Sequence, residues 1–433
     1  MNHDKRSYRD FVQSRCQTNP CVTGLAEYLR RGPGAASTIV TLDYPRSGQS
    51  APNPQTVAEA DLTKLIDATS TTAGQVLLVE NIQPHLISLL GEILDVDPIF
   101  FAGHVTTEFQ DIEKAPPPPS LALFPSQIAE KAYLHLHYQQ VLDLGRADAF
   151  KFSSYSLKSD SNVPRNVRRL PRLSGRQLAL ARACCSILVK KIDCSWICLV
   201  LMDPPAKMVL ETLASGGRKS YPSTLLHGGF EGFGDHLPDK KSMLNSLLSY
   251  FRHQPPGFIV AEPRILSLGY YPIRIGLAEW IVYTHLISRY FKYYEYTLCD
   301  IENRLRESDI IDLQRWQRRS MQSRHKLILL SEFIDYWLQQ EADKQQWNLV
   351  LKDIKHIFSQ LEQHSSSLEH MVPMATRLTF IALVFVPLSW VASLFSMADD
   401  YSPGHSSFWG KLKRIGAVLR WQVERRRTEV VFA

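Results

Sequence analysis

The chain has 433 residues, of which 45% are hydrophobic and 21% charged, and its formal net charge is +6. This length is sufficient for one large domain with its own core together with a smaller unit, and such a charge does not require a nucleic-acid partner. The scattered cysteines form no Cys-x-x-Cys pair, which argues against a zinc site and favours free or buried thiols in a reducing compartment. The N-terminus is charged and lacks the apolar run of a secretory signal, so we expect the bulk of the chain in the cytosol.

The first hundred or so residues are predicted to alternate strands with helices. In chain order we expect short helices over 1–35, a strand over 37–44, a helix over 57–68, a strand over 75–79 and a helix over 85–94. Asp97 is suited to cap a further helix, with Pro98 at its first position. A strand followed by a helix, repeated, predicts an α/β layer.

The middle of the chain contains a strand with two histidines. Four prolines at 116–119 predict an exposed spacer. The segment 133–144 alternates as a strand does and places His135 and His137 on one face. Without a third ligand nearby, the pair fits an exposed strand face better than a zinc site.

The segment 163–182 is basic and contains no acidic residue. Its arginines are Arg165, Arg168, Arg169, Arg172, Arg176 and Arg182. One interpretation is a contact with phosphate or acidic lipid. We favour a solvated loop followed by a helix start, because aromatic residues do not interleave with the arginines as in a single-strand binder.

The next segments predict a buried strand and offer no enzyme motif. The run 196–202, WICLVLM, is continuously apolar and predicts a central strand. The glycine-rich segment 227–236 is not followed by the Gly-Lys-Ser/Thr of a P-loop, so it predicts a flexible loop. Neither Gly-x-Ser-x-Gly nor His-Glu-x-x-His occurs. We therefore do not expect an enzyme.

From Pro272 onward the sequence predicts long helices. Apolar residues recur at steps of three and four from Trp347 to Leu378, which predicts one continuous helix over 343–397 packed on other helices. Its last part, 378–397, has no charged side chain and is about 20 residues long, which matches the apolar thickness of a bilayer. Pro387 is tolerable inside such a helix when neighbouring groups satisfy the freed carbonyl. The alternative is a buried core helix.

Two stretches resemble the CorA family of magnesium channels. The segment 385–398 reads FVPLSWVASLFSMA and resembles the end of the family's first membrane helix, where a proline, a small residue, aliphatics and an aromatic lead into Gly-Met-Asn. The segment 76–105 reads VLLVENIQPHLISLLGEILDVDPIFFAGHV and resembles the cytosolic domain of fungal members. The resemblance implies an α/β cytosolic domain and a long helical stalk that continues into a transmembrane helix, arranged as a funnel.

The resemblance also implies a homopentamer in which this helix lines the pore. The candidate pore-lining residues carry hydroxyl groups and are Thr379, Ser389, Ser393 and Ser396. The last three are spaced four and three apart and so lie near one helix face, although small hydroxyl residues also pack membrane helices together. Rings of neutral oxygens suit magnesium, which sheds water reluctantly.

The sequence departs from the family at the pore mouth. Ser396, Met397 and Ala398 stand where the family has Gly-Met-Asn, and Ala398 has no side-chain oxygen to hold a hydrated ion. Asp399 and Asp400 follow, either attracting cations or forming a simple helix-end loop.

The segment 398–433 is strongly basic and contains no second uncharged run of the required length. It conflicts with the positive-inside tendency if the N-terminal domain is cytosolic. The segment either folds back as an interfacial helix or diverges after Trp409 through a gene-model or splicing fault, which we favour.

We therefore expect a cytosolic α/β domain over 1–270, a helical stalk over 271–377, a transmembrane helix over 378–397 and a basic tail over 398–433. The predicted function is magnesium transport by a homopentamer in a lipid bilayer, most readily the plasma membrane, with no nucleic-acid partner. Magnesium or another divalent cation would be the cargo, and no cofactor is expected. The alternatives are a transport-incompetent membrane anchor that assembles with or regulates other subunits, and a soluble helical scaffold.

Overall fold

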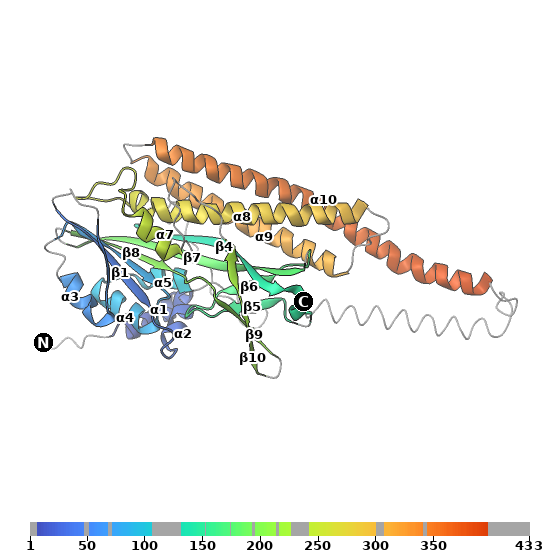
Figure 1. Cartoon of the computed structure of the whole chain (residues 1–433), viewed down its shortest axis with the longest axis horizontal. Helices are drawn as coiled ribbons and strands as arrows, with labels where there is room; N and C mark the ends of the chain where they lie inside the picture. Colours follow the sequence, from blue (N-terminus) through green and yellow to red (C-terminus); the bar gives the residue numbers. More distant parts are fainter. Residues whose placement is uncertain are drawn as a thin grey trace.

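Three long helices cover one face of a large sheet, and several short helices cover the other (Figure 1). The computed structural model describes residues 7–46, 52–67, 72–105, 131–151, 153–173, 175–192, 195–213, 216–226, 242–299, 307–340 and 344–396. The strands are β1 Thr38–Tyr44, β2 Pro54–Thr56, β3 Gly74–Glu80, β4 Tyr133–Arg146, β5 Ser156–Ser159, β6 Asn166–Arg169, β7 Arg176–Ile192, β8 Ser195–Met202, β9 Met208–Thr212, β10 Arg218–Pro222 and β11 Thr224–Leu226. The helices are α1 Tyr8–Thr18, η1 Pro20–Val22, α2 Thr23–Leu29, η2 Glu59–Asp61, α3 Leu62–Asp67, α4 Pro84–Ile93, α5 Pro98–Val105, η4 Ala147–Phe150, α7 Met243–Tyr250, α8 Ile265–Cys299, α9 Glu307–Leu338 and α10 Gln345–Ser396.

The sheet is organised around β7, its longest strand. The main order is β10-β9-β5-β6-β7-β8-β3-β1-β2, and β4 with β11 branches from β7. Along its length β7 pairs with β4, while its other edge pairs with β8 over residues 185–192 and with β6 over 179–181. The end of β8 and the start of β6 therefore meet beside the middle of β7. Among the described strands, only β3 and β8 pair in parallel.

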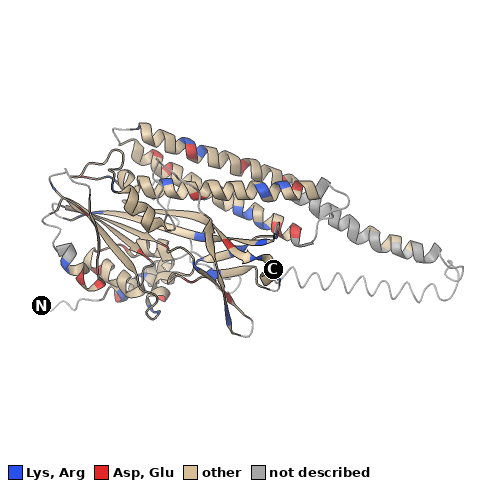
Figure 2. Ribbon diagram, in the orientation of Figure 1, with Lys and Arg blue, Asp and Glu red and all other residues tan. Residues whose placement is uncertain are grey.

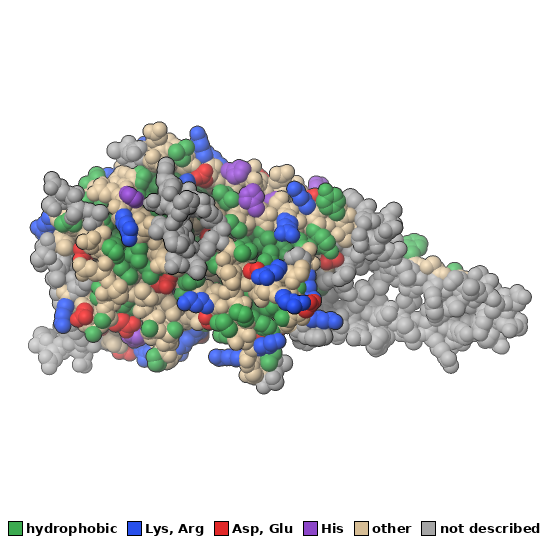
Figure 3. All heavy atoms as spheres, viewed as in Figure 1, with side chains coloured by type: hydrophobic (Ala, Val, Ile, Leu, Met, Phe, Trp, Pro, Cys, Tyr) green, Lys and Arg blue, Asp and Glu red, His purple; other side chains and the backbone are tan. Residues whose placement is uncertain are grey.

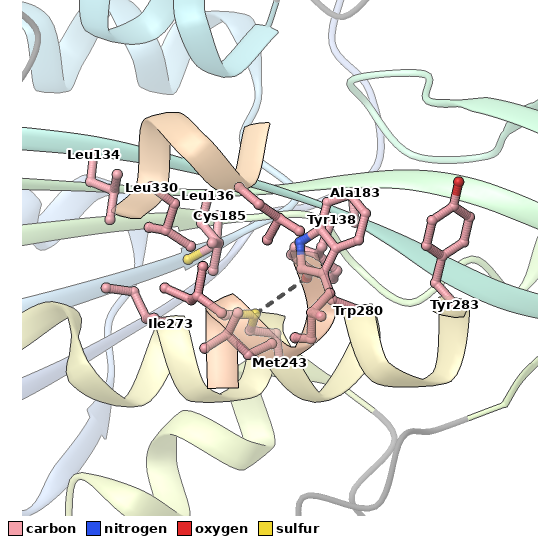
Figure 4. Packing of buried hydrophobic residues seen from close by; sticks show 14 of the residues in the cluster. Leu134, Leu136, Tyr138, Ala183, Cys185, Met243, Ile273, Trp280, Tyr283 and Leu330 are labelled. Atoms are coloured by element: carbon pink, nitrogen blue, oxygen red, sulfur yellow. Dashed lines mark hydrogen bonds between the residues drawn. The ribbon is translucent and has the colours of Figure 1, made fainter. Parts of the chain in front are cut away.

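The face under the long helices is an apolar core. On β4, alternate residues Leu134, Leu136 and Tyr138 are buried against α8, as period-two side-chain alternation requires. Figure 4 shows these side chains with Trp280 of α8 and Met243 of α7. Tyr138 Oη donates a hydrogen bond of 3.3 Å to Met243 Sδ, so this large phenol is buried with a partner for its hydroxyl.

The opposite face carries a second core under α1, α2, α4 and α5. Tyr8 and Tyr28 are buried there, and each donates a 2.8 Å hydrogen bond to a backbone carbonyl, of Val96 and Ile82 respectively. Asp97 accepts from the amide of Ile99 at the start of α5, as the predicted cap requires. The helices on both faces are thus held to the sheet by buried apolar side chains and by tyrosine hydroxyls that have hydrogen-bond partners.

Several predicted elements are confirmed. β1, β3, β4 and α4 lie within a few residues of their predicted spans, and every residue of β8 is buried. The predicted helix over 57–68 is shorter and comprises η2 and α3. The expected α/β layering holds only around β3 and β8, because most described pairs are antiparallel and the helices gather on separate faces. The segments 116–119 and 227–236 lie outside the described residues.

Two expectations about the middle and the helices are wrong. The basic segment 163–182 is neither a solvated loop nor a helix start, because it contains β6 and the first part of β7. The first long helix begins at Ile265 rather than Pro272, and Pro272 lies inside it. Apolar residues on both sides of the proline, among them Leu268 and Ile273, are buried against the sheet and hold the helix together across it.

Candidate functional site

The helix α10 is continuous over 52 residues, which corresponds to about 78 Å. Its buried side chains recur at the predicted heptad positions and are Trp347, Val350, Ile354, Ile357, Leu361, Leu368 and Met371. They pack against α8 and α9. The seam also contains His364, which is half-buried with its ring 5.1 Å from that of Phe291. The prediction of one long, packed helix is therefore confirmed as far as Met371.

The last part of α10 extends beyond the rest of the sheet and helices (Figure 1). Two large apolar side chains on it are exposed, Phe385 at 62% and Leu388 at 55%. In the space-filling view, green hydrophobic atoms are visible on the part of the molecule that extends beyond the body (Figure 3). Pro387 lies between them without ending the helix. Within the described part of the chain, no helix combines the length and apolar character needed to cross a membrane.

The predicted pore residues are described only in part. Thr379, Ser393 and Ser396 lie on the α10 backbone, but their side chains are not described. Ser389 is exposed. Met397, Ala398, Asp399 and Asp400, together with the basic tail, lie outside the described residues. The helical backbone places Ser389, Ser393 and Ser396 near one face of α10, but the directions of the Ser393 and Ser396 side chains are not described.

A buried ion pair lies where the ends of β6 and β8 meet beside β7. Arg165 donates from Nε and Nη2 to the two carboxylate oxygens of Asp203, at 2.7 Å each. Only 2% of the Arg165 and 6% of the Asp203 side chain is exposed. Arg165 Nη1 also donates to the carbonyl of His104, and Asp203 accepts from the amide of Cys184. The pair thus links α5 with β7, the start of β6 and the end of β8, at the point where β7 changes its pairing from β6 to β8.

The electrostatics of this pair favour the charged state of the arginine. Burial is the largest influence and lowers the pKa of the Arg165 guanidinium, but the Asp203 carboxylate together with Cys184 and Tyr138 outweighs it, and the pKa is raised. Burial also raises the pKa of the Asp203 carboxyl, against the opposing effect of Arg165. The bidentate geometry matches the fixed fork of a guanidinium to a carboxylate. Sequence reasoning missed this pair, because the only visible signals were one arginine in a basic run and one aspartate after a buried strand.

Two histidines share one serine hydroxyl next to the ion pair. Ser186 Oγ of β7 lies 2.8 Å from Nδ1 of His104 on α5 and 2.8 Å from Nδ1 of His135 on β4. One hydroxyl proton serves only one of them, so Ser186 donates to one ring and accepts from the other. The two imidazoles therefore hold opposite tautomers. Both Nε2 atoms are buried without a hydrogen-bond partner.

Burial keeps these imidazoles neutral. It lowers the pKa of His135 to about 4, with Lys131 and Arg165 adding to the effect. It lowers the pKa of His104 well below the ordinary value, and Arg165 contributes again. His137, the next residue on the same face, has its pKa lowered by burial and by Lys326. This side of β4 is therefore an uncharged, acid-sensitive centre of the fold.

The face that carries His135 and His137 was expected to be exposed, but both residues are half-buried. His135 lies under α5, with its ring stacked on that of Phe100 at 5.5 Å between centroids. Gly103 permits this approach, because a Cβ there would lie 2.4 Å from His135 Nε2. Among the described residues, no group of three or more His, Cys, Asp and Glu side chains is arranged to hold a metal ion. The cluster's geometry supports packing and proton-linked stability.

The rest of the basic run also serves the fold. Arg169 donates to the backbone carbonyls of Ser154, at 2.7 Å, and of Phe150, at 2.8 Å. Arg176 pairs with Asp143 of β4 at the edge of the sheet. These contacts replace the phosphate or lipid contact considered for the run, at least for the residues that make them.

Comparisons with known proteins yield a weak structural likeness. No family model matches the sequence, and no curated protein matches it. The CorA magnesium transporter from Methanocaldococcus jannaschii is similar with a TM-score of 0.39 and 9% identity, covering 90% of this chain and 97% of that chain. The full-length CmaX protein is similar with a TM-score of 0.37 and 13% identity, over 90% of this chain and 97% of that chain.

Proposed function

We propose that this chain is a CorA-like subunit that conducts magnesium across a membrane down its electrochemical gradient. One observation carries the proposal: α10 is a single helix that packs as a stalk and then continues past the body through an uncharged run. The run 378–397 has the length of a bilayer's apolar core, and its exposed Phe385 and Leu388 suit lipid or a neighbouring helix. The resemblance of 385–398 to the family's first membrane helix gives the helix its role.

In this proposal the sheet domain lies in the cytosol and five copies surround a pore, most readily in the plasma membrane. Thr379, Ser389, Ser393 and Ser396 present neutral hydroxyl oxygens to a hydrated cation. Asp399 and Asp400 raise the local cation concentration at the mouth. Magnesium is the cargo, and the proposal includes no enzyme chemistry and no cofactor.

The second candidate is a transport-incompetent membrane subunit of the same family. Ala398 favours it, because a methyl group in place of the family's asparagine amide cannot hold a hydrated ion. The density of arginines in 411–427 favours it too, since such a segment does not enter the apolar core as a second helix. In this case the stalk and anchor would serve assembly with a conducting partner.

The test is magnesium flux into liposomes that contain the purified full chain and a magnesium-sensitive dye. The channel proposal expects flux that falls when Ser389 and Ser393 are both replaced by leucine, while Leu349→Ala on the stalk surface leaves it unchanged. Flux absent from the wild type, with the protein resistant to carbonate extraction, would overturn the channel and favour the anchor. Extraction by carbonate would overturn both.

A further inference from the structure

Tyr155 sits in a clamp of three arginines between the sheet and α9. Arg319 of α9 donates a hydrogen bond to the Tyr155 hydroxyl. The guanidinium carbon of Arg315, one turn earlier on α9, lies 3.7 Å from the Tyr155 ring centroid, and that of Arg168 on β6 lies at 5.7 Å. Figure 2 shows basic residues on α9 and on the strands beside it. We call these three arginines and Tyr155 the arginine clamp.

The two guanidiniums that α9 contributes to the clamp lie near the carboxylate of Asp312. Asp312 pairs with Arg315 at 3.0 Å, and its charge also acts on Arg319. The phenol at the centre accepts one hydrogen bond, from Arg319, although guanidinium forks favour acceptors that take two. A group with two negative charges and three oxygen acceptors at the position of the hydroxyl would suit the clamp better than the phenol does.

The exposure of the segment permits modification. Tyr155 is half-buried, while its neighbours Ser154 and Ser156 are exposed. Arg315 and Arg319 are also only partly buried, and their long side chains have room to move outward around a larger group. Tyr155 therefore lies at a partly exposed edge of the sheet rather than in its core.

We propose that Tyr155 is a phosphorylation site and that Arg168, Arg315 and Arg319 receive its phosphate. In the modification, the γ-phosphorus of a nucleoside triphosphate forms a bond to Tyr155 Oη. Its bond to the bridging oxygen breaks, the nucleoside diphosphate leaves, and the phenolic proton passes to the kinase's base. The phosphate then ties the loop before β5 to α9, the helix that packs along α10. The phosphorylated clamp fastens the sheet to the helical stalk.

The test compares the full chain in detergent with and without phosphotyrosine installed at position 155 by genetic-code expansion. We expect the phosphate to slow amide hydrogen exchange in the middle of α9 about tenfold, as new charge-assisted hydrogen bonds do. The gain should disappear in Arg315→Gln/Arg319→Gln. It should persist in Arg318→Gln, which removes an exposed arginine of the same helix.

Three outcomes would overturn the proposal. Phosphotyrosine that speeds exchange in α9 would mean that the clamp rejects the phosphate. A gain that survives Arg315→Gln/Arg319→Gln would mean that other groups receive it. Inorganic phosphate that protects the unmodified protein as well as phosphotyrosine does would mean that the clamp binds a free anion. The proposal does not rest on magnesium transport, because exchange is measured without a gradient.

Discussion

The ion pair between Arg165 and Asp203 allows a quantitative test of what holds the two halves of the sheet together. Replacing Arg165 by methionine leaves the Asp203 carboxylate buried with the Cys184 amide as a donor. Replacing Asp203 by leucine leaves a buried guanidinium with the His104 carbonyl. An uncompensated buried charge costs about 3–5 kcal/mol, so we expect each single variant to lose about that much stability.

The double variant Arg165→Met/Asp203→Leu should lose no more than either single variant. It removes both charges, and it leaves the Cys184 amide and the His104 carbonyl without their side-chain partners, at a cost of about 1–3 kcal/mol each. The two single losses together then exceed the double loss by at least one single loss, so the interaction energy in the double-mutant cycle should be about 3 kcal/mol or more. The pair Arg176–Asp143 is the control, because 60% of the Arg176 side chain is exposed although only 13% of Asp143 is. Arg176→Met should cost about 1 kcal/mol or less.

The assay is urea unfolding of the full chain in detergent, followed by tryptophan fluorescence. Hydrogen exchange of β7 and β8 amides shows whether the loss is local to the junction. Additive losses in the double variant would refute the reasoning, because they would mean that the two side chains act independently. A loss for Arg176→Met as large as for Arg165→Met would refute the role of burial.

Two further predictions concern acid and the stalk. Burial lowers the pKa of His104 and of His135. As pH falls below the ordinary histidine pKa, these histidines bind protons in the unfolded chain but not in the folded one, so the folded protein loses stability as pH falls. Between pH 7 and pH 5.5 each histidine should cost about 1 kcal/mol in the urea assay, and His135→Gln should reduce this dependence. In the stalk, Leu361→Ala should cost about 2–5 kcal/mol, whereas exposed Leu349→Ala should change stability by less than about 0.5 kcal/mol; equal effects would contradict the seam.

Elements with a strong local pattern could be predicted from the sequence. The run WICLVLM has no polar residue, and a strand with such a run is stable only at the centre of a sheet, as β8 is. The seam of α10 was visible because one buried residue follows another at a heptad spacing through Leu361 and Leu368. Both signals depend on neighbours in the chain, so no knowledge of distant contacts was needed.

Contacts between distant segments could not be predicted. Arg165 resembles any arginine of a basic run, and its burial depends on Asp203 arriving from the end of another strand. His135 was interpreted as exposed, because nothing near it in the sequence indicates that α5 would cover it and that Ser186 would bind it. Gly103, two residues from the end of α5, was the only local signal of a close approach. The proposed pore residues stay predictions, since the side chains of Thr379, Ser393 and Ser396 are not described and nothing tests the role of Ser389.

The ion pair and the histidine cluster should not be independent, because Arg165 touches both. Its positive charge adds to burial in lowering the pKa of His104 and of His135. In Arg165→Met/Asp203→Leu this repulsion is absent, so both pKa values should rise toward the unfolded value and the acid-dependent loss of stability between pH 7 and pH 5.5 should shrink. Arg165→Met alone should shrink it as well, because it removes the same positive charge. If the loss of stability between pH 7 and pH 5.5 is unchanged in both variants, burial alone lowers the pKa values of the two histidines. The ion pair between Arg165 and Asp203 would then stabilise the sheet without affecting the histidines beside it.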